Sequence, residues 1–319
     1  MYKKERTMKT ILNFQKSLLL IISVAACFVS NAQFDPNFTQ YMFNEAIINP
    51  GYAGSRECLS GTMLYRQQWV GLDGAPTTLT GSIHSPIMNG KLGAGINFVN
   101  EKIGVSQRTA VSANGAYRLG LKNATLSFGL QLGLVSLSEN LSQLNLQNDQ
   151  QFMISSGKRT APNLGFGMFY STAKWYGGVS IPRMIYNRID VASGSTEIQN
   201  SFKADYFHYY LTGGGVVNLN SMIKLRPNAM LKVVKGAPAQ LDVNANLLFN
   251  DMIWAGVGYR TGDAVNLLIG AFINKQLRIG YSYDYTLSML QDYNTGSHEV
   301  MLGYDLNFNK DKVVSPRYF

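Results

Sequence analysis

Strict alternation of apolar with small or polar residues is the feature that most constrains the fold of this chain. From Ala124 to Leu134 every even position carries Ala, Leu or Phe, and Thr, Ser, Gly and Gln lie between them. The same two-residue period recurs at 240–249, 277–285 and 299–308. Successive side chains of a β-strand point to opposite faces. The pattern therefore predicts strands with one apolar face and one polar or small face.

Charged residues lie on the polar face of these strands. Asp242, Arg278, Asp284, Glu299 and Asp305 all occupy it. A soluble sandwich hides its apolar face in a dry core and turns its polar face to water. A membrane barrel turns an apolar belt to lipid and a polar, often glycine-rich face to its lumen. Alternation alone fits both classes, so further features must decide.

The number and length of the strands favour a transmembrane antiparallel β-barrel. Most expected strands have about eight to twelve residues, near what a tilted membrane strand needs. An even number suits a closed barrel, the sheet that leaves no edge in lipid. We expect fourteen strands, at 61–69, 77–84, 91–99, 107–118, 124–135, 163–171, 174–181, 206–217, 222–233, 239–250, 252–261, 264–273, 276–286 and 298–308.

The connections between these strands alternate in length. Short ones, such as 171–174 and 218–221, fall at one rim, and the long insertions 136–162, 182–205 and 287–297 fall at the other. Outer-membrane barrels have short periplasmic turns and longer outer loops. We therefore expect periplasmic N- and C-termini and long loops that face the outside.

Aromatic residues and strand breakers mark positions within the strands. Tyr and Trp prefer the headgroup level of a membrane, and aromatics gather near the strand ends at Trp69, Trp175, Tyr176, Tyr283, Tyr285 and Phe308. Pro227 and the triplet Gly213–Gly215 weaken their own strands, so we expect bulges or sharp bends there.

The first 32 residues read as a secretory signal peptide. A basic start and an apolar stretch precede Ser30–Ala32, which predicts cleavage after Ala32. The alternative is a lipobox ending in Cys27, which would then carry the lipid. Removing 1–32 takes away five of the 28 Lys and Arg and one of the 19 Asp and Glu, which leaves a net charge of +5. Cys58 is then the one remaining cysteine, so no intrachain disulfide is expected.

The residues between the signal peptide and the first strand are too many for a simple leader. They combine Pro36 and Pro50 with several aromatics and glycines, a composition of turns with anchors. This segment either plugs the lumen or caps the periplasmic mouth, and the sequence leaves both open. The expected organisation is a signal peptide 1–32, a pre-barrel segment 33–60, a barrel 61–308 and a periplasmic tail 309–319.

Cations and carboxylates together are expected to line the lumen. One interpretation is a basic interior that attracts an acidic peptide or a small anion. The other, which we favour, is an internal network that rigidifies a filled barrel, because barrel interiors are polar by default. The expected lumen residues are Arg66, Arg108, Arg118, Lys224, Arg226, Lys232, Arg260 and Arg278 with Asp242, Asp284, Glu299 and Asp305.

Catalysis, cofactors and nucleic acid find little support in the sequence. The histidines His84, His208 and His298 are scattered, no nucleophile elbow or zinc-binding helix motif exists, and one cysteine makes no metal cluster. Ser297 and His298 resemble part of a hydrolase dyad, but no third group is placed. Arg and Tyr alternate between faces, so they form no stacking surface for nucleic acid. We expect no enzyme, no metal and no cofactor.

Several short motifs, with their joint spacing, resemble one family. They are Phe-Thr-Gln-Tyr at 38–41, Asn-Pro-Gly-Tyr-Ala-Gly at 49–54, Tyr-Arg-Gln-Gln-Trp at 65–69, Gly-Ala-Pro-Thr-Thr at 74–78 and the ending Ser-Pro-Arg-Tyr-Phe. This combination resembles the PorP/SprF family of type IX secretion membrane proteins from Bacteroidota. Gly51 departs from it, because Ala is expected there in many relatives. The motif residues are Asn49, Pro50, Tyr52, Gly54, Arg66, Gln68, Trp69, Pro316, Tyr318 and Phe319.

The resemblance implies an outer-membrane barrel that serves secretion and surface attachment of cargo proteins such as gliding adhesins. It implies binding of a cargo C-terminal domain and partnership with the translocon and the periplasmic ring of that system. Long loops are then the expected cargo contacts, since a secreted cargo meets the barrel from outside. Which cargo is served, and whether this is a core or a cargo-dedicated component, stays open. The competing hypothesis is a passive porin or a transporter of lipophilic molecules, which needs an open lumen.

The two-residue period of a strand predicts which side chains of the motif at 65–69 face lipid and which face the lumen. Met63, Tyr65 and Trp69 are expected to face lipid, with Trp69 at the outer interface. Arg66 and Gln68 are expected to point into the lumen. There they would hold the pre-barrel segment or meet a cargo.

Overall fold

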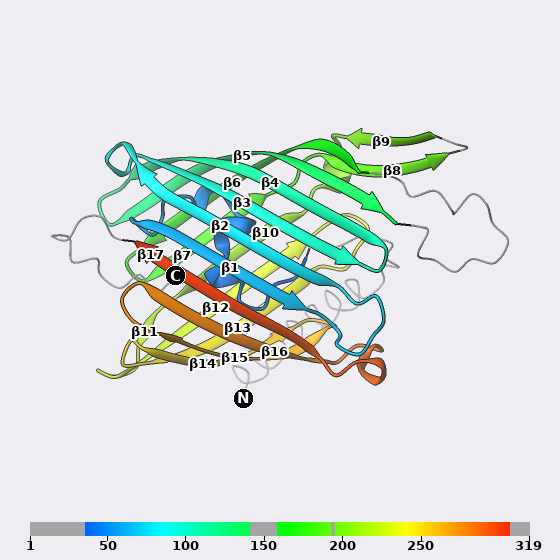
Figure 1. Cartoon of the computed structure of the whole chain (residues 1–319). Helices are drawn as coiled ribbons and strands as arrows, with labels where there is room; N and C mark the ends of the chain where they lie inside the picture. The colour runs from blue at the N-terminus through cyan, green and yellow to red at the C-terminus, as the bar shows by residue number, and fades with distance from the viewer. Residues whose placement is uncertain (1–35, 141–157, 193–194, 307–319) are drawn as a thin grey trace, which may run out of the picture.

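A computed structural model describes residues 36–140, 158–192 and 195–306, and over this range the chain forms a closed antiparallel β-barrel (Figure 1). The barrel has fourteen strands, as predicted, if β10 and β11 count as one interrupted strand. The first seven strands are β1 (Leu59–Gln67), β2 (Thr77–Ile87), β3 (Leu92–Ile103), β4 (Ser106–Gly120), β5 (Ala124–Glu139), β6 (Arg159–Thr172) and β7 (Trp175–Ile181). The others are β10 (Tyr209–Gly215), β11 (Val217–Asn218), β12 (Ile223–Val233), β13 (Gln240–Phe249), β14 (Ile253–Arg260), β15 (Ala264–Phe272), β16 (Leu277–Thr286) and β17 (Ser297–Leu306).

The barrel closes where its first strand pairs with its last. β1 and β17 run antiparallel from Leu59 opposite Leu306 to Gln67 opposite His298. The other strands of this sheet pair in chain order, with β7 pairing directly with β10, so each of the fourteen strands has a partner on both sides. This closure is what lipid demands, because an unpaired backbone edge there has no water to bond.

The alternation seen in the sequence places apolar side chains outside. In β5, Leu130, Leu132 and Leu134 are 59%, 64% and 59% exposed, whereas Ser127 and Gln131 are buried. The predicted parity of 124–134 is therefore confirmed. An apolar belt on the outside with polar side chains inside is the arrangement of a membrane barrel and not of a soluble sandwich. No helix among the described residues is long and apolar enough to cross a membrane.

The two rims of the barrel differ. One, here the short-turn rim, carries the connections 88–91, 121–123, 173–174, 219–222, 250–252 and 273–276. The other, here the long-loop rim, carries the connections expected to be long. Within 182–205 the chain forms a hairpin of β8 (Tyr186–Ala192) and β9 (Ser195–Ser201), which projects beyond the barrel (Figure 1). Strands β5 and β6 extend further into the 136–162 connection than expected, and residues 141–157 lie outside the described part.

Pro227 interrupts a ladder without forming the bulge that the sequence suggested. β10 pairs with β12 as far as Gly214 opposite Asn228, and β11 resumes at Val217 opposite Leu225 in the same register. Because proline has no N–H to donate, the pairing lapses opposite it and no extra residue is inserted.

The expected aromatic girdle needs two corrections. Tyr176 points into the lumen, 6% exposed, and its hydroxyl donates to Asn228 Oδ1 at 3.1 Å. Trp69 lies just past the end of β1 with φ of 45°, partly exposed, so strand parity no longer governs its direction. Trp175 and Tyr285 are about half exposed, at 51% and 48%, as the girdle predicts. Phe308 lies outside the described residues.

Candidate functional site

Residues 36–58 fill the lumen of the barrel (Figure 1). This lumen segment contains two short 3₁₀ helices, η1 (Tyr41–Phe43) and η2 (Pro50–Tyr52), around one turn of α-helix, α2 (Glu45–Ile48). Apart from Ile47, every residue from Phe38 to Arg56 is buried, and Gln40 and Asn49 have no exposed surface. Barrels of eight strands are filled by their own side chains. A barrel of fourteen strands has room for more, and here this segment occupies it.

The lumen segment runs from the long-loop rim to the short-turn rim. Near its start, Asn37 accepts a hydrogen bond from Lys232, the penultimate residue of β12 before a long-loop connection. At its end, Glu57 pairs with Arg118, near the short-turn end of β4, at 3.8 Å. The chain then enters β1 at that rim. Residues 1–35, and with them the expected cleavage site, Cys27 and the expected periplasmic N-terminus, lie outside the described residues.

Asn49 and Pro50 set the geometry of η2. The Asn49 side chain accepts from Gly51 N at 2.9 Å and so caps the helix, while Pro50 supplies a fixed φ at its first position. The same amide donates to Met168 O of β6 at 2.9 Å. Gly54 follows with φ of +78° and donates its N–H to His84 Nδ1 at 3.1 Å. The motif residues therefore both shape the lumen segment and attach it to the wall.

Glycines of the wall let η2 approach the strands closely. A Cβ added at Gly93, Gly129 or Gly167 would lie closer than 3.0 Å to residues 49–53 of the lumen segment. Tyr52 packs edge-on against Phe169, with ring centroids 5.1 Å apart. Side chains at these glycine positions would therefore push the segment off β3, β5 and β6.

Substituting Gly129→Ala is expected to detach η2 and to lower the free energy of unfolding by about 1–3 kcal/mol. The added methyl would meet the backbone of Pro50 and Gly51, which cannot rotate away as a flexible side chain could. The matched control is Gly115→Ala in β4, where nothing lies within 4 Å of the added Cβ. Urea unfolding in detergent, followed by tryptophan fluorescence, measures the difference. Equal midpoints for the two variants would contradict this account of the packing.

An ion network near the long-loop rim holds the start of the lumen segment. Arg66 of β1 pairs with Asp284 at 2.7 Å and with Glu299 at 3.3 Å, and all three are at most 2% exposed. The Glu299 carboxylate accepts the backbone N–H of Thr39 at 3.0 Å and of Gln40 at 2.8 Å. Carboxylates that accept backbone N–H groups and guanidinium groups together form strong, charge-assisted bonds. The wall therefore holds the segment through its backbone N–H groups, which are present whatever the side chains at positions 39 and 40.

Arg260 extends this network. Its Nε donates to Asp242 Oδ1 at 2.6 Å, and its Nη1 lies 3.3 Å from Asp284 and 3.2 Å from Asp263. The Thr39 hydroxyl donates to Asp284 and accepts from both Arg66 and Arg260. One threonine of the lumen segment thus sits between the two arginines of the wall.

A second ion network lies towards the short-turn rim. Asp305 of β17 accepts from Arg56 of the lumen segment at 2.8 Å and from Arg278 of β16 at 2.7 Å. Ser60 donates to the same carboxylate at 2.6 Å. The lumen segment is therefore held at one end by hydrogen bonds to an ion network of the wall and at the other by an ion pair.

The remaining lumen residues named from the sequence are distributed around the segment. Arg226 lies 5.0 Å from the ring centroid of Phe43, a cation–π distance. Arg108 lies 3.8 Å from Glu101, and Arg118 donates to Gly90 O at 3.0 Å. Lys224 is at the short-turn rim, where it pairs with the half-exposed Asp251. The pairing of the carboxylates with arginines supports the internal network over a free basic surface. Gln68 is buried at the long-loop end of β1, and Pro316, Tyr318 and Phe319 lie outside the described residues.

Glu45 is a lumen residue that the sequence did not indicate. It is 1% exposed and accepts from Thr212 of β10 at 2.5 Å. Burial disfavours its charged form and raises the pKa of its carboxyl to about 7, against the lowering effect of the Thr212 hydrogen bond. The phenols of Tyr41 and Tyr176 lie close enough to Glu45 to feel its charge.

The raised pKa of Glu45 predicts a barrel that loses stability as the pH rises. The folded pKa lies above the unfolded value, so the neutral form stabilises the fold fully below about pH 4.5, and this contribution is lost as the pH rises through 7. Between pH 5 and pH 8 the expected loss is about 2–3 kcal/mol. Glu45→Gln keeps an acceptor for Thr212 and should remove this dependence. Urea midpoints of both proteins across that range measure it, and parallel curves would contradict the assignment to Glu45.

The serine–histidine pair at the long-loop rim has structural contacts. Ser297 Oγ accepts from Trp69 N at 3.1 Å, and His298 Nδ1 lies 2.6 Å from the Tyr281 hydroxyl. No group of three His, Cys, Asp or Glu among the described residues is placed to hold a metal ion.

The chain resembles one protein family and, more distantly, several solved structures. A family model described as type IX secretion system membrane protein PorP/SprF matches residues 30–304. No curated protein matches the sequence. Similar solved structures include Omp33 of Acinetobacter baumannii, at 8% identity and TM-score 0.44, covering 78% of this chain and 96% of that one. A FadL homologue of Pseudomonas aeruginosa has 10% identity and TM-score 0.45, covering 87% and 96%. Sequence identities and TM-scores this low indicate nothing about function.

Proposed function

Because this chain belongs to the PorP/SprF family of type IX secretion system membrane proteins, we propose that it is an outer-membrane component for particular secreted cargo proteins. It would bind the C-terminal domain of a cargo at the cell surface and help to secrete and attach it. The family match over residues 30–304 carries this proposal. Gliding adhesins are one class of cargo that such a protein would serve.

The long-loop rim is the proposed place for cargo contact. It carries the projecting β8–β9 hairpin and the connections 136–162 and 287–297, and long outer loops of barrels commonly carry function. We place this rim outside the cell and the short-turn rim in the periplasm, following the general pattern of outer-membrane barrels. The translocon and the periplasmic ring would then be the partners inside the envelope.

The filled lumen argues against the competing function of a passive porin. Diffusion requires a water-filled path from rim to rim, whereas the lumen segment occupies the described barrel and is held at one end by hydrogen bonds to an ion network and at the other by an ion pair. A transporter of lipophilic molecules would likewise need a path past this segment.

Affinity purification of the tagged, full-length protein in mild detergent, followed by mass spectrometry, tests the proposed function. The expected result is recovery of a cargo C-terminal domain together with other secretion components. Planar-bilayer recordings of the same preparation should show no steady current. Steady porin-like conductance together with recovery of neither cargo nor secretion components would overturn the proposal and support the porin.

A further inference from the structure

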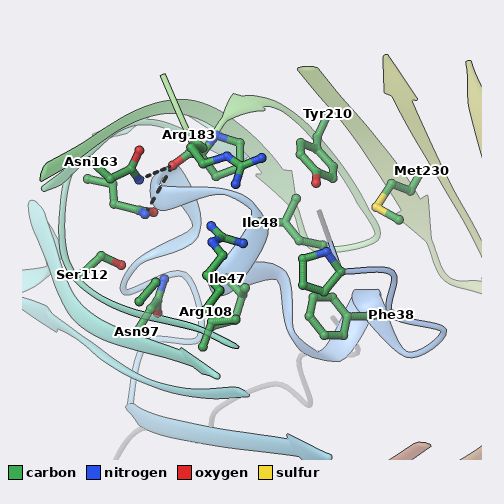
Figure 2. Close-up of a pocket in the computed structure, with 15 residues that line it drawn as sticks. Phe38, Ile47, Ile48, Asn97, Arg108, Ser112, Asn163, Arg183, Tyr210 and Met230 are labelled. Carbon is green, nitrogen blue, oxygen red and sulfur yellow. Dashed lines mark hydrogen bonds between the residues drawn. The ribbon is translucent and has the colours of Figure 1, made fainter. Parts of the chain in front are cut away.

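The cavity beside the lumen segment is too small for most ligands. Figure 2 shows this hollow, with Phe38, Ile47 and Ile48 of the segment and Asn97 and Ser112 of the wall among the side chains that line it. Its volume is about 70 Å³, whereas small-molecule sites usually measure about 300–1,000 Å³. A larger partner would therefore meet the barrel elsewhere, at a rim or on the outer face.

Exposed lysines are a feature of the short-turn rim. Four of the six short turns carry one lysine each, and all four side chains are exposed. They are Lys91, Lys122, Lys174 and Lys275. None of the four has a carboxylate partner among the residues that the structure describes. Their charges are therefore available to a partner.

The carboxylates of this rim do not offset these charges. The exposed carboxylates among its described residues are Glu57 and Asp251. Glu57 lies 3.8 Å from Arg118, and Asp251 lies 2.6 Å from Lys224. Each carboxylate is thus matched by a cation of its own, and the four lysines of the turns remain as an excess of positive charge. Such a surface attracts an anionic partner.

Exposed apolar side chains accompany the lysines around the whole rim. Each of the six turns, or the strand residue next to it, has a large apolar side chain that is about half exposed or more. These residues are Met88, Leu121, Trp175, Met222, Met252 and Ile273. Turn residues that face water are usually small or polar. A set that surrounds the rim matches a bilayer, which surrounds a barrel, rather than a protein that contacts one side of it.

Lysine beside an apolar side chain is a combination that suits the boundary of a membrane. A lysine extends its apolar stem along hydrocarbon and keeps its ammonium group at the level of the headgroups. Tryptophan prefers the same level, and Trp175 directly follows Lys174. A membrane surface that carries anionic lipids attracts lysines placed beside it.

We propose that the short-turn rim binds the headgroups of anionic phospholipids. The four lysines contact the headgroups, and the apolar side chains of the turns enter the acyl boundary beside them. The charge of the headgroups follows from the lysines. That these lipids belong to the periplasmic leaflet rests on the orientation proposed above.

Electron paramagnetic resonance of spin-labelled lipids tests this proposal. The full-length protein is reconstituted into phosphatidylcholine bilayers with a trace of spin-labelled phosphatidylglycerol or spin-labelled phosphatidylcholine. The fraction of each lipid that the barrel immobilises gives its relative association constant. At low salt, phosphatidylglycerol is expected to associate about threefold more tightly. This preference should fall towards one at about 1 M salt, where charges are strongly screened. Equal association of the two lipids at low salt would overturn the proposal.

Replacing the four lysines together by glutamine is expected to bring the ratio of the two association constants close to one. The changes are Lys91→Gln, Lys122→Gln, Lys174→Gln and Lys275→Gln. All four residues lie in exposed turns, so the strands keep their pairing. Heat-dependent migration on gels verifies that the variant folds. An unchanged ratio in the folded variant would overturn the assignment to these lysines.

The matched control removes four exposed lysines from the long-loop rim. It carries Lys102→Gln, Lys158→Gln, Lys203→Gln and Lys235→Gln, and so has the same net charge as the first variant. It is expected to keep most of the preference for phosphatidylglycerol. An equal loss in both variants would show that total charge, and not the short-turn rim, selects the lipid, and would overturn the proposal.

An acidic protein is the other occupant that this rim could take. In that case the parent and the first variant would show the same lipid ratio, and affinity purification would lose the acidic protein from the variant. That result would overturn the binding of lipid. Copurification of cargo, which tests the proposed function, is expected to be equal in the parent and the variant, so the two proposals can fail separately.

Discussion

Deleting residues 38–54 is expected to convert a closed barrel into an open channel. The deletion removes η1, α2 and η2, which occupy the lumen between the two rims. The wall is a closed sheet without them, because β1 pairs with β17 along the whole length of β1. A barrel of this strand number is wider than the eight-stranded barrels whose own side chains fill them. Single-channel recordings in planar bilayers should therefore change from no steady current to a stable, ohmic one.

Two controls make this result interpretable. Deleting residues 141–157, which removes an equally long stretch from the β5–β6 connection, should leave the lumen closed. Heat-dependent migration on gels reports whether each variant folds into a barrel. A folded 38–54 deletion that passes no current would show that wall side chains alone close the lumen, and would weaken the case for a plug.

The barrel could be predicted from the sequence because its signal is local. Each stretch such as 124–134 or 299–308 carries its own inside and outside faces through a two-residue period. The two-residue period does not predict the direction of a side chain beyond a strand. The predicted orientation of Trp69 failed for this reason, because Trp69 follows the end of β1 and has a positive φ. Tyr176 was misplaced because Trp175 beside it has the same preference for the interface, and one of two adjacent strand residues must point inward.

The location of the lumen segment could not be predicted in the same way. Residues 36–58 have no period, and residues 49–54 pack on Gly93, Gly129 and Gly167, which come from three different strands. Likewise, parity placed Arg66, Asp284 and Glu299 inside, but only the closure of β1 on β17 makes them partners across more than 200 residues. Glu45 gave no signal, since one carboxylate in an irregular segment reads as solvated until its surroundings are known.

Replacing Arg260 by Ala is expected to cost about 3–5 kcal/mol, because the buried Asp242 carboxylate loses its ion-pair partner and Asp284 loses one of its two arginines. Arg260 has no exposed side-chain surface and contacts Asp242 at 2.6 Å and Asp284 at 3.3 Å. Its loss also removes a donor to Thr39, so the effect should reach the lumen segment. The difference in urea midpoint between variant and parent, at equal slope, measures this cost.

The matched control is an ion pair that water already solvates. Lys235 and Asp205 lie 2.9 Å apart near the long-loop rim, with side chains 71% and 58% exposed. Lys235→Ala should therefore change the free energy of unfolding by no more than about 0.5–1 kcal/mol. Adding Asp242→Asn to Arg260→Ala should recover part of the loss, since it removes one of the stranded charges. If Arg260→Ala costs no more than the exposed control, the lumen network is not what holds the segment in the barrel.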